Sequence, residues 1–275
     1  MTETKHAAEF SRNELMTVMA ARALKDGERV LAGTGIPQVA ATLAKYTHAP
    51  NLVILVENGY AGAIPVHPFV GTSDNRALYR STIFTTFLDM NGMVLHRGKV
   101  DTGFLTGMEV DMYGNLNLTV IPSWDTPKAR PSRGGGANDM ASLAERVLVI
   151  MRHEKRKFPA RVSYITCPGH IDGLEARKKA GLRGKGPEFV FSNLAVLGFD
   201  EESKRMKLIS LHPGVTLEEV KANTGFELMI PSRRVPTTEP PSVEEQDLIR
   251  NVIDTSGFYT SWKEPKLAWW GKGDE

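Results

Sequence analysis

The sequence predicts an α/β protein with an open, mostly parallel sheet, helices on both faces of that sheet, and a smaller β meander. The apolar run over 52–56, and the apolar residues that follow an arginine within 29–33 and 146–151, are typical of strands that are buried on both faces. The helix–strand–helix–strand order before residue 57 predicts a right-handed crossover between parallel strands. Short β-rich segments after residue 188 have the length and composition of a meander.

The expected elements follow one another along the chain. Residues 1–10 are expected to form a flexible lead-in, and Ser11-Arg-Asn-Glu14 has the pattern of a capping box that opens a helix ending at Gly27. Strands are predicted at 29–33, 52–56, 93–96, 104–111, 116–121, 146–151 and 162–166, and the meander at 189–191, 195–199 and 206–210. Helices are predicted from Val39 to Tyr46, which Pro37 can open, and at 75–90, 216–222 and 242–253.

Length and charge limit the class of protein. A chain of 275 residues can bury a large core, and its formal charge of +2 gives no strong attraction to nucleic acid. We expect one domain over 11–258 and a C-terminal tail, 259–275, that is flexible or docks on a partner. The single cysteine excludes an internal disulfide and suits a reducing compartment. No apolar run reaches the about 18 residues of a membrane span, and the N-terminus lacks a signal-peptide core. We therefore expect a cytoplasmic protein that binds neither membrane nor nucleic acid.

A carboxylate stands at the end of one predicted buried strand. Leu52 to Val56 is apolar throughout, Glu57 follows it directly, and Asn58-Gly59 turns the chain. Open α/β sheets bind their ligands at the carboxyl edge of the strands. Glu57 is therefore a candidate functional residue, although a glutamate at such a place is more often solvated or paired in a salt bridge.

Several motifs, in order, resemble one enzyme family. They are Glu57-Asn58-Gly59, Asp111-Met-Tyr-Gly-Asn-Leu-Asn117, Gly134-Gly-Gly-Ala-Asn138, His153-Glu-Lys-Arg-Lys-Phe158, Cys167-Pro-Gly-His-Ile-Asp-Gly173 and Asn223-Thr-Gly-Phe-Glu227. Together they resemble the family I coenzyme A transferases in their β-type subunit, with the glutaconate CoA-transferases the most similar branch. The resemblance covers roughly residues 12 to 258, and the ordered set is far more specific than any single motif.

The resemblance implies the three-layer fold of that family and the movement of CoA from an acyl-CoA to a free carboxylic acid. It implies that Glu57 is a nucleophile, which forms an anhydride and then a glutamyl-CoA thioester in a ping-pong sequence. Oxyanion stabilisation and CoA binding are expected from Gly59, Gly135, Gly136, Ala137 and Asn138, with the amides of Gly136 and Ala137 as paired donors. The CoA thioester is a substrate, and neither a metal nor a prosthetic group is implied. A homologous α-type subunit is expected to complete an obligate hetero-oligomer.

The acyl pocket is expected to involve Asn58, Tyr60, Glu109 and Asn115. Three positions depart from the family's pattern: Val56, where many relatives have Ser; Glu109, where Gln is frequent; and His170, where the glutaconate enzyme has an aromatic residue. If Glu109 stands near Glu57, repulsion would raise the pKa of one of the two carboxyls, which leaves the nucleophile assignment open. The resemblance does not fix which acids are exchanged, although a dicarboxylate or an oxo acid suits it.

Other reactive residue types have simpler interpretations. His67, in the loop over 62–74 that is expected to line the pocket, is either a proton donor or an ordinary loop histidine. Cys167 precedes Pro-Gly without visible acid–base partners, which favours a structural thiol over a nucleophile. His153-Glu154 lacks a second histidine at helical spacing, so a salt-linked structural segment is favoured over a zinc site. The loop over 122–136 is either an anion site at a helix N-terminus or a flexible surface loop.

Two alternative functions remain open. The same fold with different chemistry would give a CoA-thioester hydrolase or ring-opening hydrolase, but a related steroid-degrading branch of that kind lacks a glutamate at this position. A non-catalytic ligand-sensing module is the other alternative, and the absence of a recognisable DNA-binding helix pair argues against it.

Overall fold

The main architectural feature is a single large sheet. The computed structural model describes residues 5–65, 67–130, 134–231 and 234–261. Within them a nine-stranded sheet has the order β11-β10-β9-β8-β5-β1-β2-β3-β4, and β6 and β7 form a separate two-stranded sheet. All neighbours from β9 to β2 are parallel, and only β3 and β10 run against the others in this sheet. The predicted open, mostly parallel α/β sheet is confirmed.

The elements have the following bounds. The strands are β1 Arg29–Leu31, β2 Val53–Val56, β3 Tyr60–Ala61, β4 Ile83–Phe84, β5 Thr102–Leu105, β6 Glu109–Val110, β7 Leu116–Asn117, β8 Arg146–Met151, β9 Pro187–Ser192, β10 Ala195–Phe199 and β11 Met206–Leu211. The α-helices are α1 Arg12–Arg22, α2 Ile36–Tyr46, α3 Phe87–Asp89, α4 Ala137–Leu143, α5 Ala176–Lys179, α6 Leu217–Ala222 and α7 Val243–Leu248. Two 3₁₀ segments, Asn75–Leu78 and Lys155–Lys157, and two π-helical segments, Met90–Leu95 and Ile249–Ile253, are also present.

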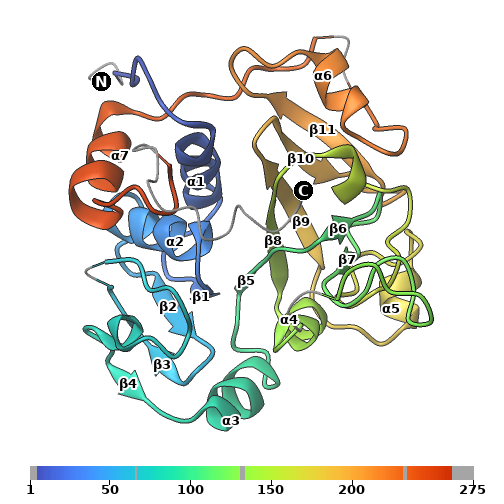
Figure 1. Ribbon diagram of the computed structural model, residues 1–275. Helices are drawn as coiled ribbons and strands as arrows, with labels where there is room; N and C mark the ends of the chain where they lie inside the picture. The colour runs from blue at the N-terminus through green and yellow to red at the C-terminus, as the bar shows by residue number, and fades with distance from the viewer. Residues whose placement is uncertain (1–4, 66, 131–133, 232–233, 262–275) are drawn as a thin grey trace.

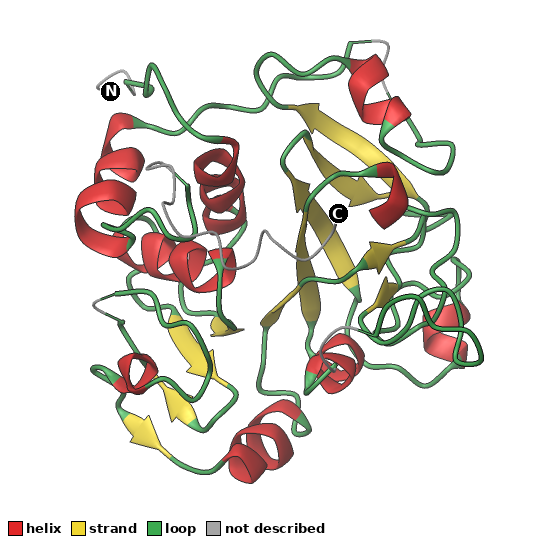
Figure 2. Cartoon of the chain, in the orientation of Figure 1, coloured by secondary structure: helices red, strands yellow, loops and turns green. Residues whose placement is uncertain are grey.

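Side chains of the central strands alternate between two apolar layers, one on each face of the sheet. Every residue of β8 is buried, with Val147 and Val149 in one core and Leu148 and Ile150 in the other. The first core packs against α4 and α6, and the second packs against α1, α2 and the π-helical segment that follows α7. Figures 1 and 2 show these two groups of helices on opposite sides of the strands. Helices on both faces were predicted and are found.

Capping chemistry explains where several helices begin. Ser11 and Glu14 form the predicted capping box of α1, and Ser242 and Glu245 form one at α7. The helix that Pro37 was expected to open is α2, whose first turn contains that proline. The predicted meander is β9–β11, and it extends the main sheet through the parallel pairing of β9 with β8.

Two stretches differ from their predicted structure. The helix over 75–90 and the strand at 93–96 are wrong, because this stretch contains a 3₁₀ segment, β4, and a helical segment that runs from α3 to Leu95. The strand at 162–166 is also wrong, because those residues are irregular. Contacts with distant segments override local preference in both places: Thr85 N donates to Gly59 O at 2.8 Å, and Leu118 N donates to Thr166 Oγ1 at 2.9 Å. The strands expected at 104–111 and 116–121 are shorter than predicted.

The two ends of the described chain lie against the domain. Ala7 N donates to Pro241 O and Val243 N donates to Lys5 O, each at 2.9 Å, so part of the expected flexible lead-in is held beside α7. Tyr259 Oη donates to Phe69 O at 2.9 Å. The rest of the expected tail, with Trp262, Trp269 and Trp270, lies outside the described residues. In the described part of the chain, no helix has the length and apolar character needed to cross a membrane.

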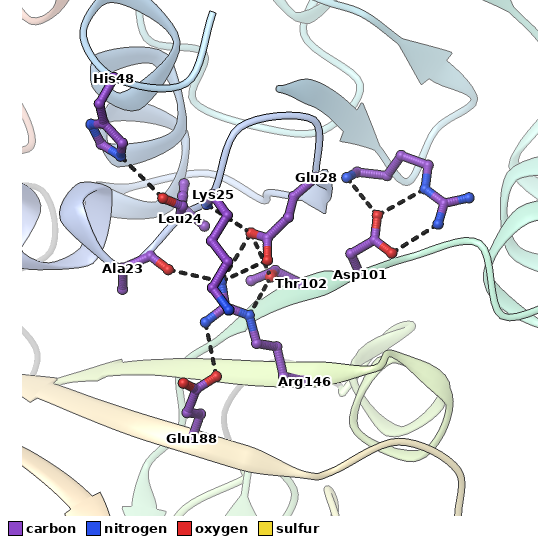
Figure 3. Close-up of polar contacts among 10 residues, drawn as sticks. Ala23, Leu24, Lys25, Glu28, His48, Asp101, Thr102, Arg146 and Glu188 are labelled. Carbon is purple, nitrogen blue, oxygen red and sulfur yellow. Dashed lines mark hydrogen bonds and ion pairs between the residues drawn. The ribbon is translucent and has the colours of Figure 1, made fainter. Parts of the chain in front are cut away.

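A buried arginine joins the amino ends of the central strands. The Arg146 guanidinium, at the start of β8, donates to Thr102 Oγ1 at 2.9 Å, to Glu188 at 2.8 Å and to Glu28 at 2.9 Å (Figure 3). It also donates to the carbonyl of Ala23 after α1, at 2.8 Å. One side chain therefore connects the α1–β1 turn with β5, β8 and β9, on the sheet edge opposite Glu57.

We expect Arg146→Met to lower the free energy of unfolding by about 3–5 kcal/mol, because it leaves the Glu28 and Glu188 carboxylates without their cation. Urea unfolding followed by circular dichroism measures this loss. Arg156→Met, which breaks the exposed pair with Glu154, is the matched control and should cost less than about 1 kcal/mol. Equal losses in the two variants would contradict the structural role of Arg146.

Candidate active site

Glu57 lies where β2 ends, at the carboxyl edge of the parallel strands. The Leu55 and Val56 side chains before it are buried, whereas Glu57 itself is partly exposed. Its carboxylate forms no ion pair with any described residue, and Thr72 Oγ1 lies 3.4 Å from Oε1. A partly exposed carboxylate without a nearby cation retains its lone pairs for reaction with a ligand.

Two residues of the loop over 62–74 lie beside the Glu57 turn. Besides the contact between Thr72 and Glu57, Asn58 Nδ2 donates to Ser73 Oγ at 2.9 Å. Asn58 therefore fixes the loop beside the carboxylate. Thr72 and Ser73 are site residues that sequence reasoning did not single out, since their only signal was membership of this loop.

Gly59 has a packing role in this structure. It adopts a φ of 111°, and a Cβ built on it would lie 2.1 Å from the carbonyl oxygen of Thr85. Its N–H donates to Val56 O at 3.0 Å, so this amide is engaged within the turn. The expectation that Gly59 contributes an open oxyanion donor does not match these bonds. The residue instead allows β3 and the segment at Thr85 to pack beside the nucleophile candidate.

The glycine loop over 134–138 lies close to the Glu57 carboxylate. A Cβ added to Gly136 would lie 3.4 Å from Glu57 Oε2 and 3.5 Å from Asn91 Oδ1. Gly136 immediately precedes α4, and its N–H makes no hydrogen bond with a described residue, whereas the Ala137 N–H donates to Gly134 O at 2.9 Å. Gly136 and Ala137 were expected to act as paired donors. Among the described residues, only the Gly136 N–H is without a hydrogen-bond partner and thus available to a ligand. Gly135 has a φ of 51° and open space beside it.

Two further residues hold this arrangement. Asn138 Nδ2 donates to Thr166 O at 2.7 Å, which fixes the first turn of α4 and thereby the glycine loop. Asn91 is buried in the π-helical segment, where Nδ2 donates to Phe87 O at 2.9 Å and Oδ1 faces Gly136. Asn91 was not expected in the site, because the segment around it was predicted with the wrong secondary structure.

The other residues expected in the acyl pocket form contacts elsewhere. Glu109 is buried and accepts hydrogen bonds from Asn117 Nδ2 at 2.7 Å and from Ser163 N at 2.8 Å. Within the described chain no hydrogen bond or ion pair joins it to Glu57. Asn115 is also buried, and its amide bonds the Asp111 carboxylate and the backbone of the 169–171 loop. These two side chains stabilise the β6–β7 turn. Burial raises the pKa of Asp111 there.

Three other residues that the sequence singled out, Tyr60, His67 and Cys167, have neighbours that define their roles. Tyr60, in β3, packs edge-to-face on Phe84 with ring centroids 6.2 Å apart. His67 lines a separate cavity of about 410 Å³ with Arg76 and Tyr79. Burial raises the pKa of the Cys167 thiol to about 12, so it stays protonated and inert, as a structural thiol would.

His153 and Glu154 are adjacent in sequence but have different structural roles. Glu154 pairs with Arg156 at 3.0 Å, as the salt-linked interpretation expects. His153 instead is buried between Ser192 Oγ and Thr224 Oγ1, each at 3.0 Å from a ring nitrogen. Among the described residues, no group of three His, Cys, Asp or Glu side chains is placed to hold a metal ion.

The site therefore combines a partly exposed carboxylate with an open backbone N–H and a glycine that leaves room beside both. A carboxylate can attack a carbonyl carbon, and an adjacent N–H can stabilise the oxyanion that forms. This combination suits covalent acyl chemistry at Glu57.

Comparisons with known proteins identify the family to which the chain belongs. The family model described as coenzyme A transferase matches residues 13–223. The chain is 36% identical over 239 residues to a subunit of the 3-oxoadipate CoA-transferase of Pseudomonas knackmussii, covering 87% of this chain and 92% of that subunit. It is 36% identical over 252 residues to a subunit of the glutaconate CoA-transferase of Acidaminococcus fermentans, covering 89% and 93%. The crystal structure of glutaconate CoA-transferase from the same organism superposes with a TM-score of 0.87 at 32% identity, covering 94% of this chain and 100% of that one. The chain belongs to the coenzyme A transferase family.

Proposed function

We propose that this chain is the β-type subunit of a heteromeric CoA-transferase, which moves CoA from an acyl-CoA to a free carboxylic acid through covalent intermediates on Glu57. The observation that carries the proposal is the approach of the Gly136 backbone to the Glu57 carboxylate, with 3.4 Å between Oε2 and the position of a Cβ on that glycine. The two groups are far apart in sequence, and acyl transfer needs both at one carbonyl carbon.

The reaction proceeds by two exchanges at Glu57. A Glu57 oxygen attacks the acyl-CoA carbonyl, and the C–S bond breaks to release CoA thiolate and leave a mixed anhydride. The thiolate attacks the Glu57 carbonyl carbon, which expels the first acid as its carboxylate and leaves a glutamyl-CoA thioester. An incoming carboxylate then attacks this thioester, and the same steps in reverse give the new acyl-CoA and free Glu57. No net proton or electron is required.

The Gly136 N–H supports each step. Every attack creates a tetrahedral oxyanion, and one preorganised backbone donor lowers such a barrier by about 3 kcal/mol. Glu57 has to be ionised to attack, and its partial exposure keeps solvent near the carboxylate without a counter-ion that would compete for it. The absence of a Cβ on Gly136 leaves space for the acyl group.

This chain has an exposed apolar surface beside the site, on which a partner subunit can pack. Large apolar side chains are exposed along one short stretch, which we call the apolar ridge: Ile83, Phe84, Phe87, Leu88 and Met93. Thr85, within this stretch, is hydrogen bonded to Gly59 next to Glu57. Exposed apolar patches of this kind mark protein interfaces. Both transferase relatives are named as one subunit of their enzyme, which supports an α-type partner that covers the apolar ridge and closes the open side of the Glu57 site.

The substrates follow in class from the relatives. Their names refer to 3-oxoadipate and glutaconate, so we expect one exchanged acid to be a dicarboxylate or an oxo acid. The CoA thioester is consumed as a substrate, and we assign no prosthetic group. The single cysteine, buried and unpaired, supports function in the cytoplasm.

Co-expression with the α-type subunit, followed by an exchange assay, tests this proposal. The complex should form a new acyl-CoA only when a second carboxylic acid is added, with total thioester conserved. Release of free CoA in the absence of an acceptor acid would identify a thioester hydrolase. Tight binding of an acyl-CoA without any turnover would identify a sensing module.

Gly136→Ala should lower kcat for CoA transfer about a hundredfold, because the added methyl group occupies the space beside Glu57 Oε2 that the reacting carbonyl needs. Since Gly136 has a φ of −79°, alanine fits its backbone, and the melting temperature of the complex should not fall. Steady-state kinetics and thermal unfolding measure the two effects. An active Gly136→Ala complex would contradict the placement of the acyl carbonyl at this glycine.

A further inference from the structure

An exposed aromatic and cationic surface lies apart from Glu57. Trp124, Tyr164 and Ile165 are all exposed, with 51% of Trp124 accessible to solvent. The Tyr164 ring meets Trp124 edge-on at a centroid distance of 5.9 Å, and the Arg130 guanidinium lies over the Trp124 ring at 4.8 Å. We call Trp124, Arg130 and Tyr164 the Trp124 platform. The acyl-transfer chemistry described above makes no use of it.

The platform is held in place by the chain around it. Ile121 and Ala129 exchange backbone hydrogen bonds at 2.9 and 3.0 Å, which closes the loop that carries Trp124. Arg130 Nη2 donates to the Trp124 carbonyl at 3.0 Å, so the guanidinium is fixed over the ring. Such a fixed aromatic face loses little entropy when a flat ligand stacks on it.

A short series of contacts limits the distance between the platform and the Glu57 site. Tyr164 is two residues from Thr166, and a Cβ built on Gly134 would lie 2.9 Å from Thr166 Cγ2. Gly134 is in turn two residues from Gly136, which meets Glu57. An extended chain advances at most about 3.6 Å per residue, so each two-residue step spans about 7 Å or less. A ligand with a long, flexible arm can therefore reach from Glu57 to the Trp124 platform.

The chemistry of the platform matches a phosphorylated purine. Base rings stack on exposed aromatic side chains, and arginine is well suited to phosphate. Arg130 uses one N–H for the Trp124 carbonyl and forms no ion pair with a described residue, so most of its donors remain for a ligand. The Lys128 ammonium, in the same loop, forms no ion pair with a described residue either.

We infer that the Trp124 platform binds the adenine nucleotide end of the CoA substrate, with the adenine stacked on Trp124 and phosphate oxygens accepting from Arg130 and Lys128. This inference rests on the proposed function, because CoA is the thioester that Glu57 attacks. The nucleotide would then be recognised by this chain. The part of CoA that joins the nucleotide to the thiol would pass beside the glycine loop.

Truncated substrates test the inference in the assembled complex. Trp124→Ala should lower kcat/KM for acetyl-CoA about ten- to a hundredfold and leave kcat/KM for S-acetylpantetheine, which lacks the nucleotide, unchanged. Arg130→Gln should lower the affinity for CoA thioesters and abolish the preference for acetyl-CoA over its 3′-dephospho form. Tyr46→Ala and Arg156→Gln replace an exposed aromatic ring and an exposed arginine elsewhere, and should change neither ratio.

A binding measurement separates this inference from the transfer mechanism. The Glu57→Gln complex should bind adenosine 3′,5′-bisphosphate in calorimetry, and adding Trp124→Ala should weaken that binding at least tenfold. This result does not require Glu57 to be a nucleophile. Equal losses with acetyl-CoA and S-acetylpantetheine, unchanged binding of the bisphosphate, or loss of subunit assembly in Trp124→Ala would overturn the inference, and the last would identify the platform as a subunit contact.

Discussion

Glu57→Gln should reduce CoA transfer by about a thousandfold or more, the largest kinetic effect that we expect in this chain. A carboxamide has nearly the same shape as the carboxylate, yet it is a poor nucleophile and forms neither the anhydride nor the thioester. The contact with Thr72 Oγ1 at 3.4 Å can persist in the variant, so assembly and melting temperature should be retained. Initial rates of acyl-CoA formation in the co-expressed complex measure the loss.

Two further variants test whether the loss of CoA transfer comes from the carboxylate at this position. Glu57→Asp keeps the charge but withdraws the carboxylate by one methylene from the Gly136 amide, and a displacement near 1 Å costs about a hundredfold in rate. Glu154→Gln removes a partly exposed carboxylate outside the site and should leave kcat unchanged. Full activity in Glu57→Gln would show that the carboxylate is not the nucleophile.

Acidification should unfold this chain at a mild pH, near 5, which is the largest stability effect that we expect. Burial lowers the pKa of His153, His170 and His212 to about 4, from a usual value of about 6.5. All three form hydrogen bonds in the interior: His170 donates to the Pro187 carbonyl and His212 donates to the Ser192 carbonyl, and the other partners are the hydroxyls of Ser192, Thr224 and Thr238. Each is neutral when folded and takes up a proton when unfolded.

The direction of this dependence follows from proton linkage. Because the unfolded chain binds more protons between pH 6.5 and 4, stability is complete above about pH 6.5 and decreases as the pH falls through this window. Three such groups give a slope of about 4 kcal/mol per pH unit near pH 5, comparable with the whole stability of many domains. The raised pKa of Asp111 opposes this trend with a single group.

Urea unfolding at a series of pH values measures the slope. Wild-type protein should take up about three protons on unfolding near pH 5, and His212→Gln should reduce that number by about one. His96→Gln, which replaces an exposed histidine, is the control and should not change the slope. A stability that is constant between pH 6.5 and 4.5 would show that the buried histidines are not held neutral.

The part of the fold that the sequence could predict is the part set by local pattern. Apolar runs such as 146–151 are buried on both sides of the sheet, and their pattern alone indicates β8. Capping signals at Ser11 and Ser242 place the starts of α1 and α7. The region 75–96 was predicted wrongly because its structure depends on long-range bonds, such as that between Thr85 and Gly59, which no local pattern contains.

The sequence likewise predicted part of the candidate site: it indicated Glu57 and the glycine loop, but not the hydrogen bonds around them. The end of a buried strand indicated Glu57, and a family resemblance joined it to the glycine loop. That resemblance could not distinguish the Gly136 amide, which is open, from the Ala137 amide, which bonds Gly134. Nor could it show that Glu109 bonds Asn117 and Ser163, because a carboxylate at a strand looks the same in sequence whether it faces a ligand or a partner in the core.

The most direct test of covalent chemistry at Glu57 is a mass measurement on the trapped enzyme. The complex is incubated with an acyl-CoA and no acceptor, treated with borohydride or hydroxylamine, digested and analysed by mass spectrometry. We predict a mass change in the peptide that contains Glu57, confined to that residue and absent without acyl-CoA or in Glu57→Gln. An unmodified Glu57 in a complex that transfers CoA, or an adduct on another side chain, would contradict this prediction.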